Sequence, residues 1–85
     1  MFALKPGVLM TETEYGMALL DQESAEYYTL NPTATIVLQA LLDGYGTERA
    51  VEILTTRYDN VDVDLATEDV GRIVDELHSV GLVTS

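Results

Sequence analysis

The segment of residues 26–32, Glu-Tyr-Tyr-Thr-Leu-Asn-Pro, constrains the fold of this chain more than any other. Its first five residues are rich in aromatic and β-branched side chains, which favour a β-strand. Asn31 is a preferred helix N-cap, and Pro32 suits the first helical position, where a backbone N–H is not needed. We therefore expect a strand over Glu26–Leu30 that runs directly into a helix.

Two adjacent tyrosines occupy the middle of this strand. Successive side chains of a strand point to opposite faces of the sheet, so Tyr27 and Tyr28 must lie on different faces. One can pack against the core while the other faces outward, and the sequence leaves open which tyrosine has which role. A strand of this kind can receive a further strand along its edge.

Two apolar runs, residues 8–11 and residues 15–20, precede this strand, and polar segments separate the three. Three consecutive strands with short connections predict an antiparallel meander. Neither connection contains Asn-Gly or Asp-Gly, the signature of a tight hairpin, so the order of the strands is better defined than their ends.

Three helices are predicted after the strands. The first begins after Asn31 and ends at Gly44, and because apolar residues surround it we expect a buried helix. The second has Thr47 as its cap and continues to about Tyr58 with one apolar face.

We expect residues 59–64 to form a connector and the third helix to begin at Thr67. This residue is a suitable N-cap, and the two acidic residues after it suit the positive end of a helix dipole. Gly81 then ends the helix. Apolar residues at helical spacing give it a broad stripe: Val70, Ile73, Val74, Leu77 and Val80.

Length and composition limit the class of protein. The chain has 85 residues and no cysteine, so it has neither a disulfide framework nor a thiolate metal site. We find no linker or repeat and expect residues 1–85 to form a single α+β domain. Its apolar runs are far shorter than the roughly 20 residues that span a bilayer, and it lacks a signal peptide, so we expect a cytoplasmic protein without a membrane partner.

The chain is strongly acidic. Fifteen Asp and Glu residues oppose four Lys and Arg residues, which gives a formal net charge of -11. This charge repels phosphate backbones and anionic lipids, so nucleic acid is not an expected partner. A solvated surface is the favoured explanation of the acidity, and attraction of a basic partner is the alternative.

Catalysis has few candidate residues, and we expect no catalytic residue and no cofactor. His78 is the only histidine, and its helical position favours a surface or half-buried residue. No motif that activates a hydroxyl surrounds any serine. Asp59, Asp62 and Asp64 lack the glycine and the spacing of a calcium-binding loop, so no metal is expected.

The residues also argue against two other functions of small domains. A carrier protein needs a serine for its prosthetic group, normally after an aspartate, and the chain has no Asp-Ser pair. A winged helix-turn-helix would place the third helix in the DNA major groove, yet that helix exposes four carboxylates beside Arg72 and would be repelled by phosphate. A regulatory or dimerising winged helix stays as the alternative function.

A peptide that adds a strand to Glu26–Leu30 fits the residues better. About four backbone hydrogen bonds, at roughly 1 kcal/mol net each, would bind it weakly. Apolar side chains that find a pocket would add roughly 1.5 to 3 kcal/mol each and would set affinity and selectivity. For Val74, packing in the core is the preferred role.

Nearly the whole chain resembles the PqqD-like domains that recognise leader peptides of ribosomally made, post-translationally modified peptides. The resemblance rests on the order and combination of these residues: Leu30-Asn31 leading into Ala34, Leu41-Leu42-Asp43-Gly44, Thr47, Ile53-Leu54, Tyr58, Asp69-Val70, Leu77 and Gly81-Leu82. It implies a winged-helix-like fold with a three-stranded antiparallel sheet followed by three helices.

The resemblance also implies a site. The leader would join the third strand antiparallel and lie between that strand and the third helix. Carried onto this sequence, the peptide-binding residues are Glu26, Tyr27, Tyr28, Thr29, Leu30, Asp69, Val70, Ile73, Glu76 and Leu77.

As a free-standing acidic domain, the chain is most similar to the leader-binding proteins of lasso peptide clusters. The partners implied are a precursor leader peptide, a separate leader peptidase and an ATP-dependent macrolactam cyclase. Redox-cofactor and radical-enzyme pathways stay open as alternatives. The expected function is that of a non-catalytic adaptor that delivers the leader to these enzymes.

Overall fold

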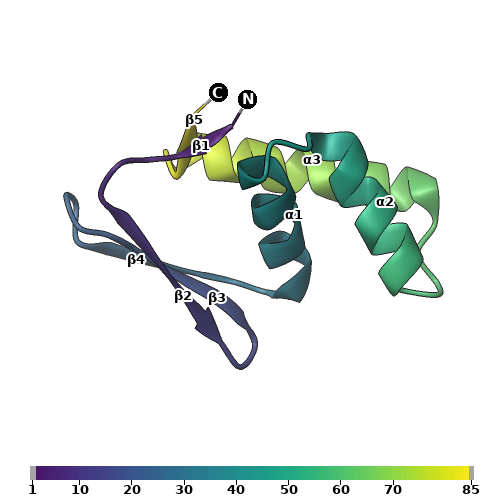
Figure 1. Cartoon of the computed structure of the whole chain (residues 1–85), viewed down its shortest axis with the longest axis horizontal. Helices are drawn as coiled ribbons and strands as arrows, with labels where there is room; N and C mark the ends of the chain where they lie inside the picture. The colour runs from purple at the N-terminus through teal and green to yellow at the C-terminus, as the bar shows by residue number, and fades with distance from the viewer. Residues whose placement is uncertain (1, 85) are drawn as a thin grey trace.

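The computed structural model describes residues 2–84 and shows a small sheet on one side of three helices (Figure 1). The α+β class and the expected order of three strands and three helices are confirmed. The elements are β1 (Ala3–Leu4), β2 (Val8–Thr13), β3 (Gly16–Asp21), β4 (Glu26–Leu30), α1 (Pro32–Leu42), α2 (Thr47–Arg57), α3 (Val63–Ser79) and β5 (Val83–Thr84).

The three longer strands form an antiparallel sheet in the order β2-β3-β4. Leu19 of β3 lies opposite Tyr28 of β4, and Leu20 lies opposite Tyr27. Paired residues share a face of the sheet, and Leu19 is fully buried whereas Leu20 is exposed. Tyr28 therefore lies on the face that packs against the helices, and Tyr27 lies on the other face.

The connection from β4 to α1 is a single residue. The Asn31 side chain accepts a hydrogen bond from the Ala34 amide at 2.8 Å, and Pro32 is the first helical residue, as predicted. Gly16 passes so close to this connection that a Cβ atom there would collide with the Leu30 carbonyl oxygen. The start of α1 is thus held by its own cap and by the backbone of β3.

The core lies where the sheet, α1 and α3 meet. Helix α1 contacts β3, α2 and α3, which explains why its apolar residues surround it. Leu19, Val37 and Leu38 are fully buried at the centre of this core. Gly44 ends α1 with a positive φ of 86°, as the sequence indicated.

Strands β1 and β5 form a second, two-stranded sheet that brings the two ends of the chain together (Figure 1). Ala3 pairs with Thr84, and Leu4 pairs with Val83. The sequence did not predict this sheet, because two residues are too few to show an alternating pattern. It fixes the N-terminal segment against the end of α3.

The starts of two helices differ from the prediction. Helix α3 begins at Val63, because Asp62 caps it by accepting a hydrogen bond from the Asp64 amide at 2.7 Å. Thr67, the predicted cap, lies one turn inside the helix and bonds the Val63 carbonyl. The N-cap of α2 is Gly46, which has no side chain, and Thr47 is the first helical residue.

Two glycine substitutions test this fold in opposite directions. Gly16→Ala should destabilise the domain by about 2 kcal/mol or more, because the new methyl group collides with backbone. Gly71→Ala should stabilise it by about 0.5 to 1 kcal/mol, because Gly71 is an exposed mid-helix residue with open space around it. Urea unfolding measures both, and equal effects of the two changes would contradict the contact between Gly16 and Leu30.

Candidate functional site

A groove of about 180 Å³ lies between β4 and α3. Thr29 points to the opposite face of the sheet from Tyr28 and Leu30, yet all three residues line the groove. The groove therefore reaches the edge of the strand itself. Its lining residues are Tyr28, Thr29, Leu30, Ala34, Ile73, Glu76, Leu77, Val80 and Leu82.

The edge of β4 beside this groove is free. Within residues 2–84, β4 pairs only with β3 and has no strand on its other side. A free edge presents unpaired backbone N–H and C=O groups, which another strand can bind. The site therefore combines a backbone template with a pocket for side chains.

The floor of the groove is apolar. Ile73, Leu77 and Leu82 are buried there, and Val80 is 46% exposed at its border. Gly81, with a φ of 77°, turns the chain back after α3, so that the Leu82 amide donates to the Leu77 carbonyl at 3.0 Å. The pocket suits an aliphatic or small aromatic side chain.

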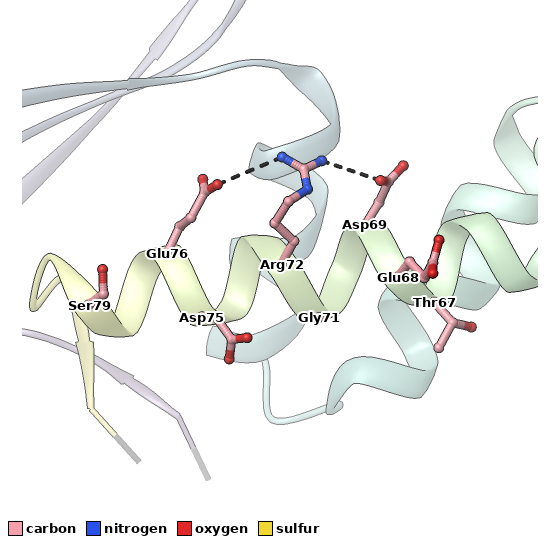
Figure 2. Close-up of a pocket in the computed structure, with 8 residues that line it drawn as sticks. All are labelled: Thr67, Glu68, Asp69, Gly71, Arg72, Asp75, Glu76 and Ser79. Carbon is pink, nitrogen blue, oxygen red and sulfur yellow. Dashed lines mark hydrogen bonds and ion pairs between the residues drawn. The ribbon is translucent and has the colours of Figure 1, made fainter.

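Two carboxylates border the apolar floor. The Tyr28 hydroxyl donates to Glu26 Oε2 at 2.7 Å, and this hydrogen bond raises the pKa of Tyr28. Glu76 stands on the α3 side, where Arg72 Nη1 lies 3.7 Å from its Oε1. The second Arg72 nitrogen donates to Asp69 at 3.3 Å, so one guanidinium lies between two acidic residues (Figure 2).

Lys5 connects both walls of the groove through the N-terminal segment. Its backbone amide donates to the Leu82 carbonyl at 2.8 Å, and its side chain donates to Asp21 Oδ2 at 2.7 Å. Asp21 is the last residue of β3 and pairs with Glu26, the first residue of β4. Lys5 therefore links the end of α3 to the end of the sheet and helps to set the width of the groove.

Six of the ten predicted site residues line this groove: Tyr28, Thr29, Leu30, Ile73, Glu76 and Leu77. Glu26 lies at the start of β4, bonded to Tyr28. Asp69 lies further along α3, away from the groove lining, and Tyr27 faces the other side of the sheet. Val70 is only 1% exposed, belongs to the core and is not among the residues that line the groove. Helical spacing alone does not separate a groove residue from a core residue.

Sequence reasoning missed three groove residues, Ala34, Val80 and Leu82. Val80 was recognised only as a member of the apolar stripe of the third helix, and Ala34 only among the residues that carry the family resemblance. Leu82 follows Gly81, and only the turn at the end of α3 brings it beside Leu77. Lys5 carried no signal, because the pairing of β1 with β5 that positions it was not predicted.

Two other hollows of the surface differ from this groove in the residues that line them. The outer face of α3 has a wide, shallow hollow without apolar side chains, where Arg72 is the only cation (Figure 2). A second hollow of about 510 Å³ lies between the start of α1, the end of α2 and α3. No residue of β4 lines either of them, so neither can combine a pocket with backbone pairing.

Residues 2–84 also bear on membrane and metal sites. No helix there is long and apolar enough to cross a membrane. No group of three or more His, Asp or Glu side chains there is arranged to hold a metal ion. Among the carboxylates of residues 59–64, Asp62 caps α3.

Known proteins resemble this chain in sequence and in fold. Residues 16–83 match the family model described as coenzyme PQQ synthesis protein D (PqqD). A solved chain described as lasso peptide synthetase B1 complexed with the leader peptide is 37% identical, with a TM-score of 0.89 over 99% of this chain and 98% of that chain. TbiB1 in complex with the TbiA(beta) leader peptide is 18% identical, with a TM-score of 0.85 over 96% and 94%, and shows the same fold. No curated protein matches the sequence.

The ion pair of Lys5 with Asp21 predicts a pH-dependent stability. The hydrogen bond from Lys5 lowers the pKa of Asp21 below 3.8, and the same bond raises the pKa of Lys5 above 10.5. A carboxylate with a lowered pKa stabilises the fold above its unfolded-state pKa, and this contribution is lost as the pH falls through the folded-state value. Asp21→Asn should therefore destabilise the domain near pH 7 and much less near pH 2.

Urea unfolding at both pH values measures this difference. Glu23→Gln is the matched control, because Glu23 is exposed and its oxygen lies 4.0 Å from the Lys5 nitrogen. A stability loss in Asp21→Asn that is the same at both pH values would contradict the role of the ion pair.

Proposed function

The chain belongs to the PqqD family, and from this we propose that it is a non-catalytic adaptor for the leader peptide of a ribosomally synthesised precursor. The observation that carries the proposal is the free edge of β4 beside an apolar groove. A solved chain 37% identical to this one over nearly its full length is complexed with a leader peptide. The leader would bind here by adding a strand to β4.

Strand addition explains how such a site can accept a flexible peptide. About four backbone hydrogen bonds to β4 contribute roughly 1 kcal/mol net each, less than the several kcal/mol that ordering the peptide costs. An apolar leader residue in the groove adds roughly 1.5 to 3 kcal/mol. Backbone pairing therefore sets the direction of the leader, and the side chain in the groove sets affinity and selectivity.

The direction of the leader determines where the modified part of the precursor, which follows the leader, lies. An antiparallel leader, as the family resemblance implies, enters beside Leu30 and leaves beside Glu26. The segment that follows the leader then extends away from α1, near the turn between β3 and β4. Processing enzymes would approach the peptide at this end of the sheet.

Charges at the groove tune this selectivity. Glu26 and Glu76 favour a lysine or arginine of the leader near the apolar anchor, and each exposed pair contributes only about 0 to 1 kcal/mol. Arg72 already lies beside Glu76, so a basic leader residue must compete with it. An acidic leader residue at this position would instead meet two carboxylates of the adaptor.

The adaptor acts through other proteins. Of the open pathways, we propose lasso peptide biosynthesis in the cytoplasm, with a separate leader peptidase and an ATP-dependent macrolactam cyclase as partners. The likeness to a lasso peptide synthetase B1 chain supports this choice. The adaptor would hold the leader in one extended conformation, which lowers the entropy that each enzyme must overcome to bind it.

Two valines of similar exposure test the groove. Val80→Gln removes an apolar side chain at its border, where Val80 is 46% exposed. We expect leader binding to weaken by about three- to tenfold, because part of the apolar anchor contact is lost. Isothermal titration calorimetry with a synthetic peptide, the leader of the precursor encoded beside this protein, measures the change.

Val63→Gln is the control, because Val63 is 59% exposed at the far end of α3. It should bind the leader like the wild type. A scrambled leader controls for unspecific binding. The groove assignment is wrong if Val80→Gln binds as tightly as Val63→Gln, and the adaptor function is wrong if the wild type binds the native leader no better than the scrambled one.

A further inference from the structure

A strap formed by residues 2–7 crosses from the end of α3 to the turn between β3 and β4, with β1 lying beside β5 on the way (Figure 1). At one end of the strap, the Phe2 ring packs edge-on against His78 of α3, with ring centroids 5.4 Å apart. At the other end, the Gly7 carbonyl accepts a hydrogen bond from the Gln22 amide at 3.1 Å, directly after β3. The strap therefore joins the helix on one side of the leader groove to the sheet on the other.

Lys5 is the residue of the strap that bonds to both sides. Its backbone amide donates to the carbonyl of Leu82, whose side chain lines the groove. Its ammonium donates to Asp21, which pairs with Glu26 at the start of β4, and Glu26 accepts from the Tyr28 hydroxyl. A continuous series of contacts thus runs from Leu82 on one wall of the groove, through Lys5, to Tyr28 on the other wall.

Asp21 makes this tie depend on a single lysine. It is the one charged residue buried within residues 2–84, with 4% of its surface exposed. Its other carboxylate oxygen accepts from the Glu23 and Ser24 amides at 3.0 and 3.4 Å and so forms the turn before β4. A buried carboxylate needs a cation beside it, and Lys5 is the only Lys, Arg or His among the first 48 residues.

The tie between Lys5 and Asp21 acts on the groove from outside, because neither residue lines it. It holds the walls together where β4 begins, and the one-residue connection at Asn31 holds them where β4 ends. A groove of about 180 Å³ between fixed walls accepts a side chain only up to a limiting size, because a packed contact tolerates little extra volume.

We propose that the strap determines the size of the leader side chain that the groove accepts, with Lys5 and Asp21 as its positioning residues. This inference rests on the proposed adaptor function. With the tie intact, the groove binds an aliphatic or small aromatic side chain and rejects an indole. Without the tie, the start of β4 moves away from α3, so a larger side chain is accepted and a smaller one loses contacts. Selectivity falls although every residue that lines the groove is unchanged.

Lys5→Met tests the proposal, because methionine keeps an unbranched apolar stem and removes the ammonium. Arg49→Met is the matched control, since Arg49 forms an exposed ion pair with Glu52 on α2, a helix that does not line the groove. The probes are two synthetic leaders, the native sequence and the same sequence with tryptophan at the anchor position. The anchor is the leader position whose alanine variant binds the wild type and Val80→Gln with equal affinity.

We expect the tryptophan leader to bind the wild type and Arg49→Met at least about tenfold more weakly than the native leader, because the indole overpacks the groove. In Lys5→Met this affinity ratio should fall to about threefold or less, since the walls are no longer tied. Lys5→Arg keeps a cation within reach of Asp21 and should restore the ratio. Isothermal titration calorimetry measures all of these affinities.

A double variant separates the tie from overall stability. Lys5→Met alone leaves Asp21 buried without its cation, which destabilises the domain. Combining it with Asp21→Asn removes this charge, and the asparagine oxygen can still accept from the turn amides. We expect thermal stability to recover in the double variant relative to Lys5→Met, while the affinity ratio stays low.

Three outcomes would overturn the proposal: an affinity ratio in Lys5→Met equal to that of the wild type, an equal fall in Arg49→Met, or a ratio that recovers together with stability in the double variant. The last would mean that the unpaired carboxylate, and not the lost tie, had altered the groove. Failure of the adaptor function is a separate result, since the wild type would then bind the native leader no better than a scrambled one.

Discussion

The one-residue connection between β4 and α1 is the constraint on which the rest of this structure depends. Asn31 ends the strand and caps the helix, so the direction of β4 is tied to a helix that lies in the core. Gly16 packs against the same point from β3. Because β4 cannot turn away from α1, its free edge stays beside α3, and the groove between them exists before any peptide binds. A preformed groove reduces the entropy lost on binding.

The N-terminal segment completes this arrangement from the opposite end. Lys5 bonds the carbonyl of Leu82 through its backbone and the carboxylate of Asp21 through its side chain. The sheet is thus held at one end by the connection to α1 and at the other by Lys5. Between these points, β4 has two separate faces, with Tyr28 toward the groove and Tyr27 toward solvent. The groove and the solvent-exposed face therefore lie on opposite sides of one short strand.

Sequence reasoning predicted the elements whose signals are local. Asn31, Pro32, Gly44 and Gly81 each specify a helix end through their own backbone chemistry, and all four lie where they were expected. The start of α3 was misplaced because Asp62 and Thr67 are both good caps, and nothing local decides between them. Long-range features were missed for a different reason. Pairing of β1 with β5, burial of Val70 and the position of Leu82 depend on packing between distant segments, which periodicity cannot resolve.

Amide hydrogen exchange of the domain with and without its leader peptide tests the central claim most directly. Strand addition at β4 predicts that alternate amides of Glu26–Leu30, those that face the free edge, become protected when the leader binds. Amides of the opposite edge strand, β2, should exchange at unchanged rates. A leader that binds with unchanged exchange throughout β4 would contradict the account, because the peptide would then be held elsewhere on the domain.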